Sequence, residues 1–204
     1  MSIVKLNNQG VKNATSFGSI TGLGSMTFIK KLTASGSSTL SFVDGASSVV
    51  LDNTYKEYLF TFKNIHPETD TANFTVGFRD GGTDYDAVKT TTYFRAYHSE
   101  AGSSAFGYKT DQDLAQSTSY QNLCYSLDGS SDGNTAGYLQ LFAPASTTFV
   151  KHFISRTSCV HSAPEEHDSY IAGYCNTTTA IDGVQFKMST GNIDAGDICL
   201  YGIA

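Results

Sequence analysis

Residues 58–79 read YLFTFKNIHPETDTANFTVGFR, and this stretch decides the fold. Large apolar residues occupy every second position of residues 58–62 and again of residues 74–78. Successive side chains of a strand point to opposite faces, so each half predicts a strand with one apolar and one mainly polar face. The link contains Pro67 and closes on Asp70, which favours a loop. The stretch therefore predicts an antiparallel hairpin.

Further strands are expected on both sides of this stretch, separated by short turns rich in Gly, Ser and Asp. We expect the segments 119–127 and 136–143 to pair across the loop 128–134. No window shows helical periodicity and no repeat of fixed period is present, so we predict an all-β protein, a jelly-roll-like antiparallel β-sandwich of about ten strands. The other predicted strands are 26–32, 39–43, 48–51, 89–98, 105–108, 147–156, 169–175, 183–188 and 197–203.

Residues 1–25 differ from the rest in carrying only scattered apolar residues among Asn, Gly, Ser and Thr. This density is too low for a separate core, so we expect an extended N-terminal arm that docks onto another protein, followed by a single β-sandwich domain at 26–204. The N-terminus lacks the apolar run of a signal peptide, which predicts synthesis in the cytosol. The expected docking residues are Val4, Leu6, Val11, Phe17, Ile20 and Leu23.

Net charge and cysteine spacing disfavour several classes of function. With 13 basic and 19 acidic residues, the net charge is -6, which disfavours a nucleic-acid-binding surface. The cysteines show no C-x-x-C spacing, so neither a zinc site nor a redox motif is indicated. For a cytosolic protein we expect buried thiols at all four cysteines, the alternative being a disulfide formed after release from a cell. The cysteines are Cys124, Cys159, Cys175 and Cys199.

Two loops have the composition of a metal site. Asp128, Ser130 and Asp132 place oxygens at alternate positions before Gly133, as in a calcium loop, but the twelfth position is Leu139 instead of glutamate. We therefore expect a solvated turn there, and the same for the acidic residues of segment 80–86. The second loop carries the possible ligands His161, Glu165, Glu166, His167 and Asp168. We expect it to be a charged solvent loop interrupted by a proline, so no metal and no cofactor is predicted.

No catalytic motif is present: the sequence contains no G-x-S-x-G, no H-E-x-x-H and no phosphate-binding loop. We therefore predict no enzymatic activity and no catalytic residues. Tyrosine offers an apolar face and a polar tip, which suits binding surfaces. The residues expected to contact a receptor or partner are Tyr85, Tyr108, Tyr93, Arg95 and Tyr97.

Several blocks resemble a structural-protein family of tailed bacteriophages, particularly marine phages including cyanophages. These blocks are GSMTFIKKLTAS at 24–35, YKEYLFTFKNIHPETD at 55–70, STTFVKHFISR at 146–156 and AGYCNTTTAIDGVQFKMSTGNIDAGDICLYGI at 172–203, with a similar leader, NNQGVKNATSFGSITGLGS, at 7–25. The resemblance implies a place in a virion and carries no catalytic residues.

The resemblance leads us to expect a non-enzymatic virion protein that is docked by its arm onto other virion proteins. Its simplest location is a tail fibre or other host-contact appendage. A capsid decoration protein is the alternative within this class, and a carbohydrate-binding module or glycan hydrolase is the alternative outside it. Exposed strand edges favour a homo-oligomer, for which we expect a trimer. Host-surface glycans or proteins are the expected external partners; nucleic acid and membrane insertion are not expected.

Overall fold

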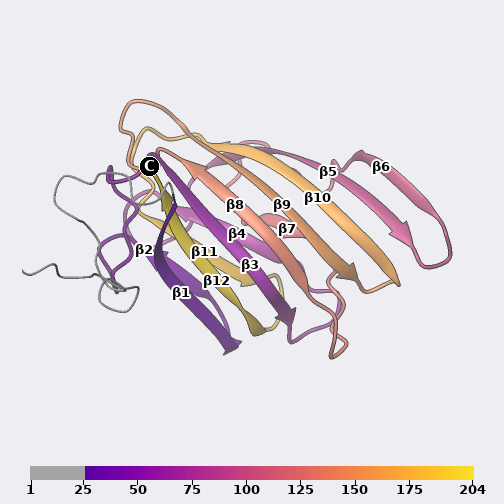
Figure 1. Ribbon diagram of the computed structural model, residues 1–204. Coiled ribbons are helices and arrows are strands. Elements are labelled where there is room, and N and C mark those ends of the chain that lie inside the picture. Colours follow the sequence, from indigo (N-terminus) through magenta and orange to yellow (C-terminus); the bar gives the residue numbers. More distant parts are fainter. Residues whose placement is uncertain (1–25) are drawn as a thin grey trace, which may run out of the picture.

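A computed structural model describes residues 26–204, and these residues form strands and turns (Figure 1). The expected N-terminal arm, with its docking residues, lies outside the described residues. No helix in the described part of the chain could span a membrane. The strands are β1 (Met26–Ser37), β2 (Leu40–Val43), β3 (Glu57–Pro67), β4 (Phe74–Arg79), β5 (Lys89–Ser99), β6 (Ser104–Tyr108), β7 (Gln121–Cys124), β8 (Thr135–Phe142), β9 (Lys151–His161), β10 (Glu165–Cys175), β11 (Gly183–Met188) and β12 (Ile193–Ile203).

The strands form two antiparallel sheets. The wide sheet has eight strands in the order β1-β12-β3-β8-β9-β10-β5-β6, and the narrow sheet has four in the order β2-β11-β4-β7. Within this arrangement β1-β12-β3-β8 and β2-β11-β4-β7 form a jelly roll, because the chain crosses between sheets from β1 to β2, β3 to β4, β7 to β8 and β11 to β12. The jelly-roll prediction is confirmed, with twelve strands in the described residues instead of about ten.

The four remaining strands are two insertions, the hairpins β5–β6 and β9–β10, which extend the wide sheet beyond β8. In Figure 1 they make up the side of the wide sheet that ends at β6.

The aromatic stripes of residues 58–79 lie between the sheets. Phe62 of β3 meets Phe74 of β4 edge to face, with 5.2 Å between ring centroids, and Phe186 of β11 packs 5.5 Å from Phe60. The prediction that both stripes are buried is confirmed, but the predicted hairpin is wrong: β3 belongs to the wide sheet and β4 to the narrow one. Alternation identifies the core-facing side of a strand, and it does not identify the strand's hydrogen-bonding partner.

Other strand predictions need similar corrections. The segments expected to pair across the loop 128–134 also lie in different sheets, as β7 and β8. Residues 48–51 are not a strand, although Val49 and Leu51 are buried. The loop expected at 157–168 is largely strand, because β9 continues to His161 and β10 begins at Glu165.

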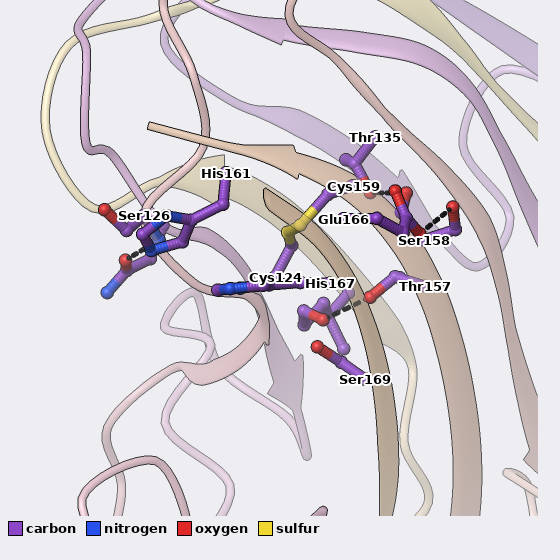
Figure 2. Close-up of a disulfide and its surroundings, with 12 residues drawn as sticks. Cys124, Ser126, Thr135, Thr157, Ser158, Cys159, His161, Glu166, His167 and Ser169 are labelled. Atoms are coloured by element: carbon purple, nitrogen blue, oxygen red, sulfur yellow. Dashed lines mark hydrogen bonds between the residues drawn. A yellow bond between two sulfur atoms is a disulfide. The ribbon is translucent and has the colours of Figure 1, made fainter. Parts of the chain in front are cut away.

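The two sheets are also joined covalently, by a disulfide between Cys124 of β7 and Cys159 of β9 (Figure 2). The prediction of four thiols is therefore wrong for this pair, since the fold brings together two cysteines that are 35 positions apart. Cys175 is a buried free cysteine and Cys199 a half-buried one.

Candidate functional site

A group of titratable side chains lies beside the disulfide, on the inner face of the wide sheet. His161 and Glu165 are paired across the β9–β10 hairpin, and His167 is paired with Cys159 on one side and Tyr97 on the other. The imidazole rings of His161 and His167 have centroids 4.0 Å apart. Potential ligand atoms of His161, Glu165 and His167 lie within 4.8 Å of one another, and Figure 2 shows both rings near the disulfide. We call these three residues the histidine cluster.

Burial determines the protonation of the cluster. His167 is almost completely buried, which lowers the pKa of its imidazole to about 4, and the nearby charges of His161 and Arg95 act in the same direction. His167 Nε2 and Glu165 Oε2 are 2.8 Å apart, and this hydrogen bond lowers the pKa of the carboxyl. A neutral imidazole that donates from Nε2 to the carboxylate leaves Nδ1 as an acceptor, and His167 Nδ1 is buried without a hydrogen-bond partner among the described residues. Burial also lowers the pKa of His161.

The cluster has the residue types of a zinc site, but its hydrogen bonds do not match one. Zinc binds an imidazole through a nitrogen lone pair. The Ala163 N–H donates to His161 Nδ1 over 2.9 Å, so the proton of a neutral His161 lies on Nε2. The Arg95 guanidinium, 5.7 Å from the ring of Tyr97 and 5.9 Å from that of Tyr125, adds a positive charge nearby. The contacts therefore fit a structural network that closes this end of the sandwich.

The five titratable residues predicted to share a solvent loop instead alternate between two faces. His161, Glu165 and His167 lie on the inner face, whereas Glu166 accepts a hydrogen bond from Ser158 Oγ (2.7 Å) and Asp168 pairs with Arg156 on the outer face. Polar residues at inward positions obscured the strand pattern, which is why this segment resembles a loop.

The calcium-like segment forms a turn whose backbone N–H groups are bonded by the carboxylates of Asp128 and Asp70. Asp128 Oδ1 accepts the Ser130 N–H over 2.9 Å, and the Gly129 N–H donates to Asp70 Oδ1 over 3.0 Å. Ser130 and Asp132 are exposed. These contacts agree with the solvated turn expected for Asp128, Ser130 and Asp132.

Most of the residues predicted to contact a partner do not lie on the outer face of the wide sheet. Tyr93 is completely buried, with its hydroxyl 2.7 Å from Ser169 Oγ, so that prediction is wrong. Arg95 and Tyr97 are half-buried on the same inner face, beside the histidine cluster. Tyr85 is half-buried at the narrow sheet, close to Gly183. The exposed face of β5 is the opposite one.

That outer face carries a line of large side chains across five adjacent strands. Cross-strand pairing places Tyr138 of β8 opposite Arg156 of β9, then Tyr170 of β10, Phe94 of β5 and Tyr108 of β6. Tyr138, Tyr170 and Phe94 are each 38% exposed and Tyr108 is 41% exposed. We call these five residues the cross-strand row. Only Tyr108 was predicted as a contact residue; Phe94 and Tyr170 could have been found as large side chains opposite the buried positions of their strands.

The side chains of the row are held by one another and by two carboxylates. Arg156 makes two hydrogen bonds to Asp168, of 3.0 and 2.7 Å, and lies 4.8 Å from the ring centroid of Tyr170. The Tyr170 hydroxyl donates to Asp168 over 2.8 Å. At the other end, the Tyr108 hydroxyl donates to Asp113 over 2.5 Å, and the ring of Phe94 meets that of Tyr108 edge to face at 5.1 Å.

Shallow hollows flank the row on the outer face. One, of about 490 Å³, is lined by Gly137, Tyr138, Arg156, Ser158 and Glu166. Another, of about 290 Å³, lies between Tyr138, Phe94 and Tyr170.

Comparison of the chain with models of known protein families and with curated proteins finds no match.

Proposed function

We propose that the chain is a non-enzymatic structural component of a tailed-phage virion, most simply part of a tail fibre or other host-contact appendage. The observation that carries the proposal is the resemblance of the blocks at 24–35, 55–70, 146–156 and 172–203 to virion proteins of marine tailed phages. The jelly roll supports it, because viral capsid proteins and lectin domains use this architecture, although a fold alone does not define a function.

Two features favour an appendage over a capsid decoration protein. The wide sheet extends beyond the jelly roll by two hairpins, and its outer face carries the cross-strand row, so a large exposed face is available for contact. Residues 1–25 precede β1, which lies at the edge of the wide sheet opposite β6. A decoration protein on the head remains the alternative, and the row also suits a free carbohydrate-binding module.

The assignment is tested on purified particles of the phage that encodes the chain. Quantitative mass spectrometry should find the protein in particles, at a few tens of copies for an appendage and hundreds for the capsid. Its absence from particles would reject the virion proposal.

Deletion of residues 2–24 tests the docking arm. We expect the truncated protein to fold but to be lost from particles, whereas full-length protein carrying Tyr170→Ala should be incorporated at normal occupancy. Normal incorporation of the truncated protein would contradict docking by residues 1–25.

Sedimentation of the purified full-length chain should give the mass of a trimer.

A further inference from the structure

The cross-strand row is an exposed platform that lies outside the core between the two sheets. Its side chains project from the outer face of the wide sheet, while the intervening residues of the same strands, such as Leu139, Ser155 and Ile171, are buried on the inner face. Neighbouring strands lie about 4.8 Å apart, so five strands give a platform about 19 Å long. This length suits an extended ligand with several units better than a single small molecule.

The platform combines ring faces with fixed polar groups. Asp168 holds both the Arg156 guanidinium and the Tyr170 hydroxyl, and Asp113 holds the Tyr108 hydroxyl. Side chains that are already ordered lose little entropy when a ligand binds. Aromatic rings offer apolar faces, whereas guanidinium and carboxylate groups bond to hydroxyls. A sugar presents these two surfaces together, an apolar C–H face and an edge of hydroxyls.

Charge and composition disfavour the other classes of ligand. Carboxylates at Asp168, Glu166 and Asp113 accompany Arg156 on or beside the row, and the whole chain has a net charge of -6, so a polyanion such as nucleic acid would be repelled. At the centres of protein interfaces Tyr, Phe and Arg are enriched, whereas Asp and Glu are depleted. The carboxylates of Asp168, Glu166 and Asp113 on or beside the row therefore disfavour a second copy of the chain as its occupant.

We propose that the cross-strand row binds a neutral polysaccharide, whose sugar rings stack on Tyr138, Tyr170 and Phe94 while Arg156 and Asp168 bond to hydroxyl groups. The flanking hollows, of about 490 and 290 Å³, leave space for sugar substituents on both sides of Tyr138. The inference depends on the geometry of the sheet and stands independently of a place in a virion.

The test uses the full chain in affinity electrophoresis through gels containing dextran, galactomannan or mixed-linkage β-glucan, followed by an array of neutral oligosaccharides of four or more sugars. We expect retardation by at least one of these polymers. Tyr170→Ala, Phe94→Ala and Tyr138→Ala should each weaken binding about tenfold, because each removes one stacking face. Tyr170→Phe should retain most of the affinity, since it keeps the ring.

Phe149→Ala is the matched control, because Phe149 is 73% exposed and lies outside the row. Thermal unfolding of each variant would reveal any loss of fold. The proposal is overturned if none of the polymers or oligosaccharides binds, if binding is unchanged in all three row variants, or if Tyr170→Ala instead dissociates an oligomer. Incorporation of the same variants into particles separates this result from the virion proposal.

Discussion

Cys124 at the end of β7 and Cys159 in β9 are joined by a disulfide, so a covalent bond connects the narrow sheet to one of the inserted strands of the wide sheet. A chain made in a reducing cytosol would acquire this bond only after release from the cell.

Removal of this disulfide should destabilise the fold. For a loop of 35 residues, the chain-entropy model gives a loss of about 3–4 kcal/mol in the free energy of unfolding. Urea denaturation of the double variant Cys124→Ala, Cys159→Ala measures it, with Cys199→Ser as the control. Alkylation of the unreduced, denatured protein should label Cys175 and Cys199 alone; labelling of all four cysteines would show that the bond is absent in solution.

Acid should weaken the fold through the histidine cluster. His167 has a folded-state pKa of about 4, below the value of about 6.5 for an exposed histidine, so its contribution is complete above pH 6.5 and is lost as the pH falls towards 4. The groups around it are Glu165, His161, Arg95 and Tyr97.

The unfolding free energy of the wild type should fall by up to about 3 kcal/mol more than that of His167→Gln over this range. His98→Gln, at an exposed histidine, is the control. Parallel pH profiles for the wild type and His167→Gln would contradict the prediction.

Two lysines are completely buried on either side of Cys175, and their removal should be costly. Lys151 Nζ donates to the carbonyls of Thr177 (3.0 Å) and Thr179 (2.5 Å), and burial lowers its pKa. Lys151→Ala leaves a cavity and two unpaired carbonyls, for an expected loss of about 3 kcal/mol in the free energy of unfolding. Lys151→Met should cost about half of that, because it fills the space.

Lys63→Met, at an exposed lysine, should have little effect and serves as the control for Lys151→Met. Chemical denaturation gives all three values. A loss for Lys151→Ala no larger than that for Lys63→Met would mean that the buried ammonium contributes nothing to stability.

A glycine within β12 is required by the backbone. Gly196 has φ +119° at an irregularity in the pairing with β3, and a side chain there would meet Asn64 O and Ile65 Cα. Gly196→Ala should therefore lower the free energy of unfolding by about 2 kcal/mol or more. Gly107→Ala in β6 is the control, because its added methyl would meet nothing within 4 Å. Equal melting temperatures for the two variants would refute the requirement.

The sequence was sufficient to predict most of the strands but not their partners. Phe60, Phe62 and Phe74 follow the period of two, and all three are buried as expected. The same period cannot show that β3 and β4 face each other from different sheets, because each satisfies its hydrogen bonds with strands distant in the sequence.

The candidate sites were harder to predict for a related reason. His167 and Ser169 occupy inward positions usually held by apolar residues. The sequence pattern therefore predicts a strand shorter than β10 and places His167 in a solvent loop. The cross-strand row depends on pairing between five strands, and no local pattern contains that information.

Four of the five residues in the row, Arg156, Tyr170, Phe94 and Tyr108, belong to the two hairpins inserted into the jelly roll. The frame and the exposed platform are thus encoded by largely separate segments of the gene. Sequence change at the outward positions of the hairpins can alter the row while their inward positions, such as Tyr93, Phe153 and Ile171, stay packed in the core. The proposed polysaccharide binding could then change its target without a change of scaffold.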